Sequence, residues 1–528
     1  MTPRTARLLL GCTGVLLVAA TAWALLQSAQ WRLTVRLRDS AAHELALAAA
    51  GGTPYRWRLN DPGDIIAGRV FFARDGVFGP DELVVTSDGR AFEVGLVLAR
   101  PVDVGRFSGL RLPARCDPAG MLSLRVRERL DAPEFASAAI PCGATRQQLS
   151  LDLATIGWTS GGRPSGSPRA AAMLRLSFAM PPGGVVRLNE ATLDRTRDMR
   201  RIDLQLPVSV VEAGANAHGE TAVYRLPAGG TGQQTALATL AALDARQQLP
   251  VLLPQAGSIE QQLALRNAVY ARLPGAILIP ATALAETFSR ARALVHAPPG
   301  GGERHAVRWP AVLAYVLTLA LFRLRPPGQE RLRALVEVLL ALAGPLWLIL
   351  GDGFDGNPDV TQTVLIASIV LYAVSLSVPR PWRWAGSARA WGLAAGVVAL
   401  TTVCALAFNG MQGVERAMGH AQLARYLVWA LFQQYLICGV CTERWLVVTG
   451  SKALAVYLGA LGFALLHFPN GALMLATLAG GLCWCALYLR ERALLPLAAS
   501  HAACAIVLLG LLPREMLWSA EVSVRFFQ

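Results

Sequence analysis

From Val307 onward the chain is a succession of long apolar segments with short polar connections. A helix needs about 20 mostly apolar residues to cross a hydrocarbon core of about 30 Å. We therefore expect membrane-spanning helices here, although several segments are short for a span. They lie at about 307–322, 334–350, 361–378, 390–408, 422–441, 453–468, 471–489 and 493–512. The composition agrees: 54% of the residues are hydrophobic and 16% are charged, which is too apolar for an ordinary soluble protein.

The N-terminus carries a further apolar run, Leu8 to Leu26, after a short segment with two arginines. A cleaved signal peptide is one interpretation, with Ala22-Trp23-Ala24 as its cleavage signal. The run is longer than the usual apolar region of about 7–15 residues in a signal peptide. This length favours an uncleaved membrane anchor over residues 1–30.

The charges of the connections predict the orientation. The net charge is +14, and Lys452 is the only lysine, so the positive charge comes from arginine. The loops at 323–333 and 380–389 are basic, whereas 351–359 is acidic. Basic loops face the cytoplasm, which predicts nine spans across the inner (cytoplasmic) membrane and an extracytoplasmic segment at about 28–306. The arginines are spread over many loops, so a nucleic-acid partner is not expected.

Residues 31–195 are expected to form an extracytoplasmic β-sandwich. Apolar residues alternate with other residues in several short segments, and turn signals such as Ser87-Asp88-Gly89 separate them. This pattern is typical of antiparallel sandwiches, a jelly roll being the expected type. Such domains often bind carbohydrate or protein. No aromatic platform stands out in the sequence, so a structural or docking role is favoured over sugar binding.

A small α/β module is predicted over residues 196–297. Short apolar runs at 251–253 and 276–279 accompany helical segments at 235–246 and 259–273, the latter with a capping box of Ser258 and Gln261. The glycines at 229–232 could cradle a phosphate, but they lack the lysine of a P-loop, so a turn is favoured. Residues 298–306 read as a linker to the membrane domain, 307–528.

Polar side chains interrupt three of the predicted spans. Gln433 and Gln434 lie in one, His467 in the next and His501 in the last. Polar groups at hydrocarbon depth are costly unless they find partners. Interhelical hydrogen bonds are one use for such groups. We expect Gln434, His467 and His501 instead to converge on one polar cavity.

These residues resemble the motifs of the CPBP family of intramembrane proteases, bacterial relatives of the CAAX prenyl endopeptidase. The family carries EExxxR(G), then FxxxH, then a last histidine in HxxxN or HxxxD. Here FxxxH is intact as Phe463 and His467, and His501 is kept. The first motif departs from the family, with Gln433 and Gln434 at the glutamate positions and Cys438 at the arginine position. The last motif has Ala505 in the Asn/Asp place.

The resemblance covers roughly the last 220 residues and implies a CPBP-like bundle of about eight helices. In the family the second glutamate activates a water, and the histidines orient it and stabilise the oxyanion. The resemblance implies catalytic positions at Gln434, His467 and His501, and pocket positions at Gln433, Phe463 and Asn470. It also implies a membrane-associated peptide substrate.

Three functions are compatible with this sequence. The first is an intramembrane endopeptidase with a modified water-activating residue, since the Gln434 amide cannot take a proton from water. The second is a catalytically inactive relative that acts as an envelope binding or scaffold protein. A transporter is the third and is disfavoured, because the spans show no internal repeat.

The cysteines predict one disulfide and no metal site. Cys116 and Cys142 both lie in the expected extracytoplasmic domain, where an oxidising compartment favours a disulfide. Cys438 and Cys441 lie inside an apolar span, where packing is favoured over zinc binding. No cofactor or metal is expected.

Overall fold

A computed structural model describes residues 3–98, 100–129, 131–196, 201–215, 219–243, 248–255, 257–295, 303–352, 360–376, 383–409, 420–513, 516–517 and 519–527. The chain divides into two compact units. One consists of Met1–Leu33, Ser258–Gln261 and Gly300–Gln528, and the other of Thr34–Gly257 and Gln262–Pro299. We call them the helical unit and the β-rich unit. They correspond to the helical C-terminal region and the β-rich domain that the sequence predicts.

The N-terminal helix α1, Pro3–Ala50, is longer than the predicted anchor. The sequence assigns residues 31–50 to the β-sandwich, and this assignment is wrong. The reason is visible in the burial pattern, because Leu33, Leu37, Ala41 and Leu45 are all buried and recur at every fourth position. That period belongs to one face of a helix. The part of α1 from Cys12 is long and apolar enough to cross a membrane.

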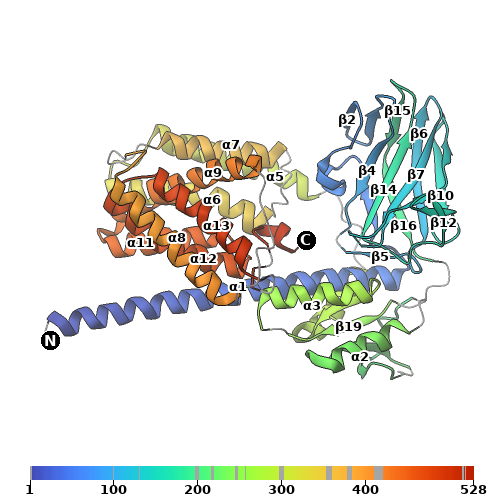
Figure 1. Ribbon diagram of the computed structural model, residues 1–528, viewed down its shortest axis with the longest axis horizontal. Helices are drawn as coiled ribbons and strands as arrows, with labels where there is room; N and C mark the ends of the chain where they lie inside the picture. Colours follow the sequence, from blue (N-terminus) through green and yellow to red (C-terminus); the bar gives the residue numbers. More distant parts are fainter. Residues whose placement is uncertain are drawn as a thin grey trace. The chain divides into compact units, whose positions relative to one another are not determined.

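Two seven-stranded sheets dominate the β-rich unit (Figure 1). The first consists of β1 (Arg56–Arg58), β16 (Glu190–Asp194), β6 (Gly109–Asp117), β15 (Val185–Leu188), β3 (Leu83–Thr86), β2 (Asp75–Phe78) and β10 (Gln147–Asp152). The second consists of β12 (Arg163–Ser165), β11 (Trp158–Ser160), β8 (Phe135–Ser137), β7 (Gly120–Arg127), β14 (Met173–Ala179), β4 (Phe92–Leu96) and β9 (Ile140–Cys142). A separate short pair joins β5 (Val102–Asp103) to β13 (Ala170–Ala171).

The predicted alternation explains how the two sheets pack. In the central pair of the second sheet, Leu122 is opposite Phe178 and Leu124 is opposite Leu176. These side chains are fully buried, and they share one hydrophobic cluster with Leu110 and other residues of the first sheet. Successive side chains of a strand point to opposite faces, so the apolar set fills the space between the sheets. The sandwich predicted from the sequence is confirmed as a β-rich domain.

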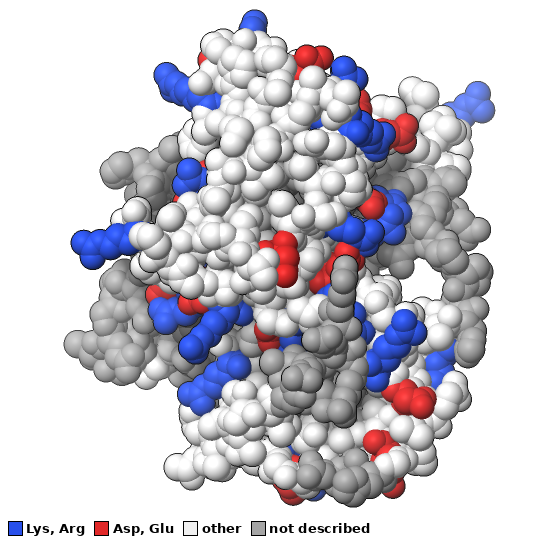
Figure 2. Space-filling model, turned by 90° about the vertical axis from the view of Figure 1, so that its right-hand side faces the viewer, with Lys and Arg blue, Asp and Glu red and all other residues white. Residues whose placement is uncertain are grey.

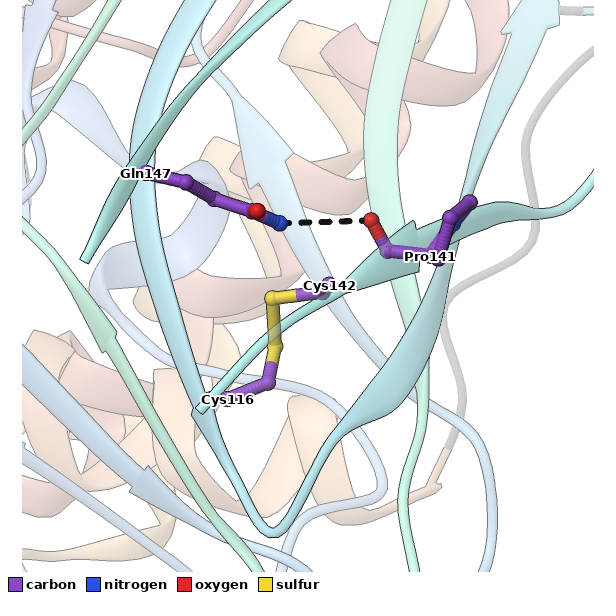
Figure 3. Close-up of a disulfide and its surroundings, with 4 residues drawn as sticks. All are labelled: Cys116, Pro141, Cys142 and Gln147. Carbon is purple, nitrogen blue, oxygen red and sulfur yellow. Dashed lines mark hydrogen bonds between the residues drawn. A yellow bond between two sulfur atoms is a disulfide. The ribbon is translucent and has the colours of Figure 1, made fainter. Parts of the chain in front are cut away.

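A disulfide joins Cys116 of β6 to Cys142 of β9 (Figure 3). The bond links the two sheets, because β6 belongs to the first and β9 to the second. Both cysteines are fully buried. Close by, the Gln147 side chain donates a hydrogen bond to the carbonyl of Pro141 at 3.3 Å. The structure thus contains the disulfide that the sequence predicts.

A parallel four-stranded sheet forms the α/β module, in the order β17 (Val208–Glu212), β18 (Thr221–Arg225), β19 (Pro250–Leu253) and β20 (Ile277–Pro280). Its helices are α2 (Gly230–Ala241), α3 (Ile259–Arg272) and α4 (Leu284–Val295). The capping box is confirmed by reciprocal bonds of 3.1 and 3.2 Å between Ser258 and Gln261. Gly229 and Gly230 both have positive φ at the start of α2, a geometry that glycine adopts readily.

The second half of α1 is part of this module's core. Ala41, Leu45 and Ala48 pack in one cluster with Ile277 of β20 and Phe288 of α4. Arg100 forms a buried ion pair with Glu44 of α1, and its guanidinium also donates to the Ala276 carbonyl at 2.9 Å. A buried ionic group of this kind holds its neighbours in one arrangement only when its hydrogen bonds are made.

The helical unit gathers the C-terminal helices in one bundle (Figure 1). They are α5 (Glu303–Leu324), α6 (Glu330–Leu346), α7 (Val360–Ser375), α8 (Ala388–Asn409), α9 (His420–Gln434), α10 (Glu443–Thr449), α11 (Lys452–Leu465), α12 (Gly471–Glu491) and α13 (Leu495–Leu511). Two π-helical stretches, Trp347–Asp352 and Tyr435–Thr442, continue α6 and α9.

Each predicted span falls on one or more of these helices. Among the described residues, four helices are long and apolar enough to cross a membrane: one in α1, Glu330–Gly351, Ala388–Phe408 and Gly471–Glu491. Three shorter helices are also apolar. Helix α5 begins at Glu303, so the predicted linker at 298–306 extends too far. Residues 296–302, and the loop residues 353–359, 377–382 and 410–419, lie outside the described residues.

Charged side chains are interspersed on the face of the molecule drawn in Figure 2. Basic and acidic residues alternate there, with apolar and neutral residues between them. Among the chain's ion pairs, Arg111 pairs with Asp194 and Arg187 with Glu82, both in the β-rich unit. On the face drawn in Figure 2, the basic side chains are not gathered into one patch.

Candidate functional site

Gln434 is the last residue of α9 and is fully buried. The π-helical stretch Tyr435–Thr442 begins immediately after it, and the Thr442 hydroxyl donates to the carbonyl of Ile437, five residues earlier, at 2.9 Å. Such π-helical turns occur frequently at functional sites. Beyond Gln434 the side chains therefore do not follow the spacing of a straight α-helix.

The Gln434 side chain contacts the last histidine of the sequence motifs. Its Nε2 lies 3.3 Å from Nδ1 of His501, which comes from α13 and is 4% exposed. An amide nitrogen can only donate, so Nδ1 of His501 accepts this bond. The neutral His501 ring therefore carries its proton on Nε2.

His467 follows the end of α11 and has the opposite arrangement. Its Nδ1 lies 2.9 Å from the carbonyl oxygen of Phe463. A carbonyl can only accept, so Nδ1 is protonated and Nε2 keeps its lone pair. The hydrogen bond of one ring nitrogen fixes the role of the other. The two histidines therefore present different groups, an acceptor on His467 and a donor on His501.

Phe463 brings the two histidines together. Its ring meets that of His467 edge-on at a centroid distance of 5.0 Å, and that of His501 at 5.4 Å. Trp484 of α12 adds a second aromatic wall, with its centroid 4.9 Å from that of His501. The predicted constellation of Gln434, Phe463, His467 and His501 thus forms one cluster in the bundle.

Four further residues support the cluster, and the sequence analysis gave none of them a role in it. The Trp484 indole donates to the hydroxyl of Ser500 at 2.9 Å, which orients the ring beside His501. The Cys438 thiol donates to Oε1 of Gln434 at 3.1 Å, and the sulfur of Cys485 lies 3.8 Å from that of Cys438. The only signal in the sequence was the position of Cys438 in the first motif, where its thiol replaces an arginine.

The two remaining predicted pocket residues have other surroundings. Asn470 caps α12, because its Oδ1 accepts from the backbone of Leu473 at 3.1 Å. Its amide nitrogen donates to the carbonyls of Ser519 and Glu521, at 2.7 and 3.1 Å. Asn470 therefore holds the C-terminal segment against the start of α12. Gln433 is half-buried beside Gln434.

The buried carboxylates of the bundle are occupied by arginines. Glu337 pairs with Arg333 and also with the buried Arg444 at 2.8 Å. Glu443 pairs with Arg492 of α12. Neither carboxylate takes the place of the base that Gln434 lacks. In the described part of the chain, no group of three or more His, Cys, Asp or Glu side chains could hold a metal ion.

Three solved structures illustrate the likeness to known folds. A mutant of the carbohydrate-binding module CBM29-2 is 12% identical, with 23% of this chain and 77% of that chain covered and a TM-score of 0.18. The xylan-binding module CBM86 of Roseburia intestinalis is 13% identical, with 28% and 97% covered and a TM-score of 0.20. The family 11 module of Clostridium thermocellum, with a bound mixed-linked tetrasaccharide, is 9% identical, with 24% and 83% covered and a TM-score of 0.19.

TM-scores this low lend no functional meaning to these likenesses. No curated protein matches the chain. The family comparison is more informative, because residues 417–507 match the type II CAAX prenyl endopeptidase Rce1-like model. The matched segment contains Gln434, Phe463, His467 and His501. The C-terminal part of this chain is thus Rce1-like, as its motifs indicate.

Proposed function

We propose that the helical unit is an intramembrane endopeptidase that hydrolyses a peptide bond of a membrane-associated substrate, with His467 as the water-activating base. The observation that carries this proposal is the different partner of each Nδ1 atom, a carbonyl oxygen at His467 and an amide nitrogen at His501. These partners leave Nε2 of neutral His467 as an acceptor and Nε2 of neutral His501 as a donor. General-base hydrolysis needs one group of each kind.

The reaction then needs no carboxylate. Nε2 of His467 takes a proton from water as the water oxygen attacks the carbonyl carbon of the substrate. The Nε2–H of His501 donates to the developing oxyanion. The protonated His467 next gives its proton to the leaving amine, which restores the neutral ring. Gln434 holds His501 in the donor form and does not itself titrate.

A cleavage assay tests this role. The purified full chain is incubated with membrane extract, and new peptide N-termini are mapped by mass spectrometry. His467→Ala should lower cleavage by at least about 100-fold, the usual contribution of a general base. His43→Ala, which changes an exposed histidine of α1, is the control and should not change it. Equal cleavage by the intact chain and His467→Ala would refute the role of His467.

A second candidate function is a catalytically inactive envelope binding or scaffold protein. The amide at Gln434 and the ion-paired state of Glu337 and Glu443 favour it. Gln434→Glu separates the two candidates. In a protease site the new carboxylate can itself take the proton from water, so hydrolysis should rise even though position 434 no longer donates to His501. A binding site should gain no cleavage, and the bundle should become less stable.

The same proposal includes a location in the inner membrane, with residues about 28–306 on the extracytoplasmic side. The basic loops support this orientation. Alkaline phosphatase fused after about residue 297 should be active, because it folds only outside the cytoplasm. Fusion within 323–333 should be inactive. The reverse pattern would place the β-rich unit in the cytoplasm and overturn the orientation. The bilayer and a membrane peptide are the proposed partners, and no nucleic acid is.

A further inference from the structure

We propose that Cys438 is a positioning residue that sets the protonated nitrogen of His501 through the Gln434 amide. This inference rests on the proposed function for its catalytic consequence, but its structural content stands separately. Three polar contacts carry it. Cys485 lies against Cys438, Cys438 against Gln434, and Gln434 against His501.

The chemistry of the groups gives these contacts a single direction. The Oε1 atom of Gln434 can only accept, so the Cys438 thiol is the donor at 3.1 Å. Because the Cys438 thiol proton is already donated to Gln434, the Cys438 sulfur can take part in the contact with Cys485, at 3.8 Å, only as an acceptor. The far end of the amide, Nε2, can only donate to Nδ1 of His501.

The direction of the thiol bond depends on which way the amide faces. A glutamine side chain can turn by 180° and exchange its oxygen and nitrogen with little change in shape. Turned in that way, Gln434 would offer its oxygen to His501 and would favour the proton on Nδ1. It would also reverse the role of Cys438, because an NH₂ group can only donate and the thiol proton would then have to turn from Gln434 to Cys485. The orientation of the amide and the direction of the thiol bond are therefore coupled, and with the thiol donating to Oε1 the amide presents Nε2 to His501.

The charges of the site agree with this role. In the resembling motif a glutamate and an arginine occupy these positions, whereas Gln434 and Cys438 are both neutral. Burying a single charge is far more costly than burying a hydrogen-bonded neutral pair. The two changes together leave the buried site neutral, and the thiol serves as the hydrogen-bond donor to the Gln434 side chain.

Packing alone is the simpler explanation for a buried cysteine, and Cys441 provides the comparison. Cys441 lies on the same π-helical stretch and is as deeply buried as Cys438. Both belong to the same hydrophobic cluster. If Cys438 only fills space, Cys438→Ala and Cys441→Ala should affect the site equally. If Cys438 positions the amide, only Cys438→Ala should act on His501.

Nitrogen NMR of the full chain, labelled with ¹⁵N-histidine and embedded in lipid nanodiscs, reads the protonated nitrogen directly. The signals are assigned from His467→Gln and His501→Gln. We expect His501 to be protonated on Nε2 in the wild-type chain. Cys438→Ser, which keeps a donor, and Cys441→Ala should preserve that form. Cys438→Ala should give a mixture of Nδ1-H and Nε2-H forms.

Either of two results overturns the inference: a wild-type His501 protonated on Nδ1, or a Cys438→Ala spectrum identical to the wild type. The wild-type spectrum decides even if Cys438→Ala does not fold. Cleavage is the second measurement, and Cys438→Ala should lower it by up to about 100-fold, as small misplacements do. If Cys438→Ala changes the protonated nitrogen of His501 but the wild-type chain cleaves no peptide, the positioning role of Cys438 stands. Only the proposed function is then refuted.

Discussion

The β-rich unit and the helical unit treat charged side chains differently. On the second sheet of the sandwich, Arg125 and Arg175 both pair with Glu93, and all three keep some exposure to solvent. In the helical unit, Arg444 is 2% exposed and depends on Glu337. The candidate site, by contrast, contains neutral polar groups only.

This difference predicts how much stability each unit loses when an ion pair is removed. Exposed ion pairs contribute about 0–1 kcal/mol each, because water already solvates both partners. A buried arginine that loses its carboxylate keeps an uncompensated charge at low dielectric. Loss of an ion pair should therefore be costly in the helical unit and cheap on the sandwich. Arg100 with Glu44 and Arg106 with Asp103 are exceptions in the β-rich unit, since both pairs are largely buried.

The largest effect is expected from Glu337→Ala. This change leaves the Arg444 guanidinium buried without its carboxylate and should lower the free energy of unfolding by about 3–5 kcal/mol. Denaturation of the full chain in detergent measures it. Arg389→Ala removes one of the partners of Glu491, an arginine whose side chain is 61% exposed, so it should cost about 1 kcal/mol or less. Equal costs for the two variants would contradict the comparison.

Glu44→Ala tests the first of these exceptions. It removes the carboxylate that faces the buried Arg100, and it should cost about 3–5 kcal/mol, as in the helical unit. Arg129→Ala breaks a pair on the surface of the same unit and should have little effect. These two results together would show that burial of the ion pair, and not the class of fold around it, decides the cost of losing it. A small cost for Glu44→Ala would mean that the other contacts of Arg100 suffice.

The next effect belongs to the disulfide. Replacing Cys116 and Cys142 together with alanine should destabilise the β-rich unit by about 2–4 kcal/mol, because the bond restricts the unfolded chain. Urea denaturation followed by near-UV circular dichroism reports this unit. Cys404→Ala, at an exposed cysteine of α8, is the control. Thiol labelling of Cys116 in unreduced, unfolded protein would show that the bond is absent.

The smallest effect is a pH dependence at Asp103. Burial raises the pKa of its carboxyl above the ordinary 3.8, against the opposing effect of Arg106 3.1 Å away. Between the ordinary and the raised pKa, the folded chain keeps a proton that the unfolded chain has released. The free energy of unfolding should therefore fall as pH rises through this window. Asp103→Asn should remove that fall, and a lowered pKa at Asp103 would give the opposite slope.

The sequence predicted most where local pattern decides the structure. Phe92, Leu124 and Phe178 alternate with polar residues because one face of each strand is buried. The α1 extension was missed because its buried face contains many alanines, which give weak contrast with their neighbours. The use of Asn470 as a helix cap could have been predicted, since Asn is a preferred capping residue.

The candidate site was predictable in its members but not in its bonds. The motifs identified Gln434, His467 and His501, because polar residues in apolar spans are conspicuous. The protonated nitrogen of each histidine follows from a partner in the folded chain, and no sequence pattern gives it. The pairing of Glu443 with Arg492 likewise joins two helices that are distant in sequence.

The second half of helix α1 packs against residues that are synthesised much later than the helix itself. Its residues Ala41, Leu45 and Ala48 leave the ribosome early, whereas their packing partners Ile277 and Phe288 are synthesised much later. At synthesis rates of about 5–20 residues per second, this delay is on the order of tens of seconds. During that time the second half of α1 has no core to enter. A nascent chain should therefore need protection of this apolar face until the module is complete.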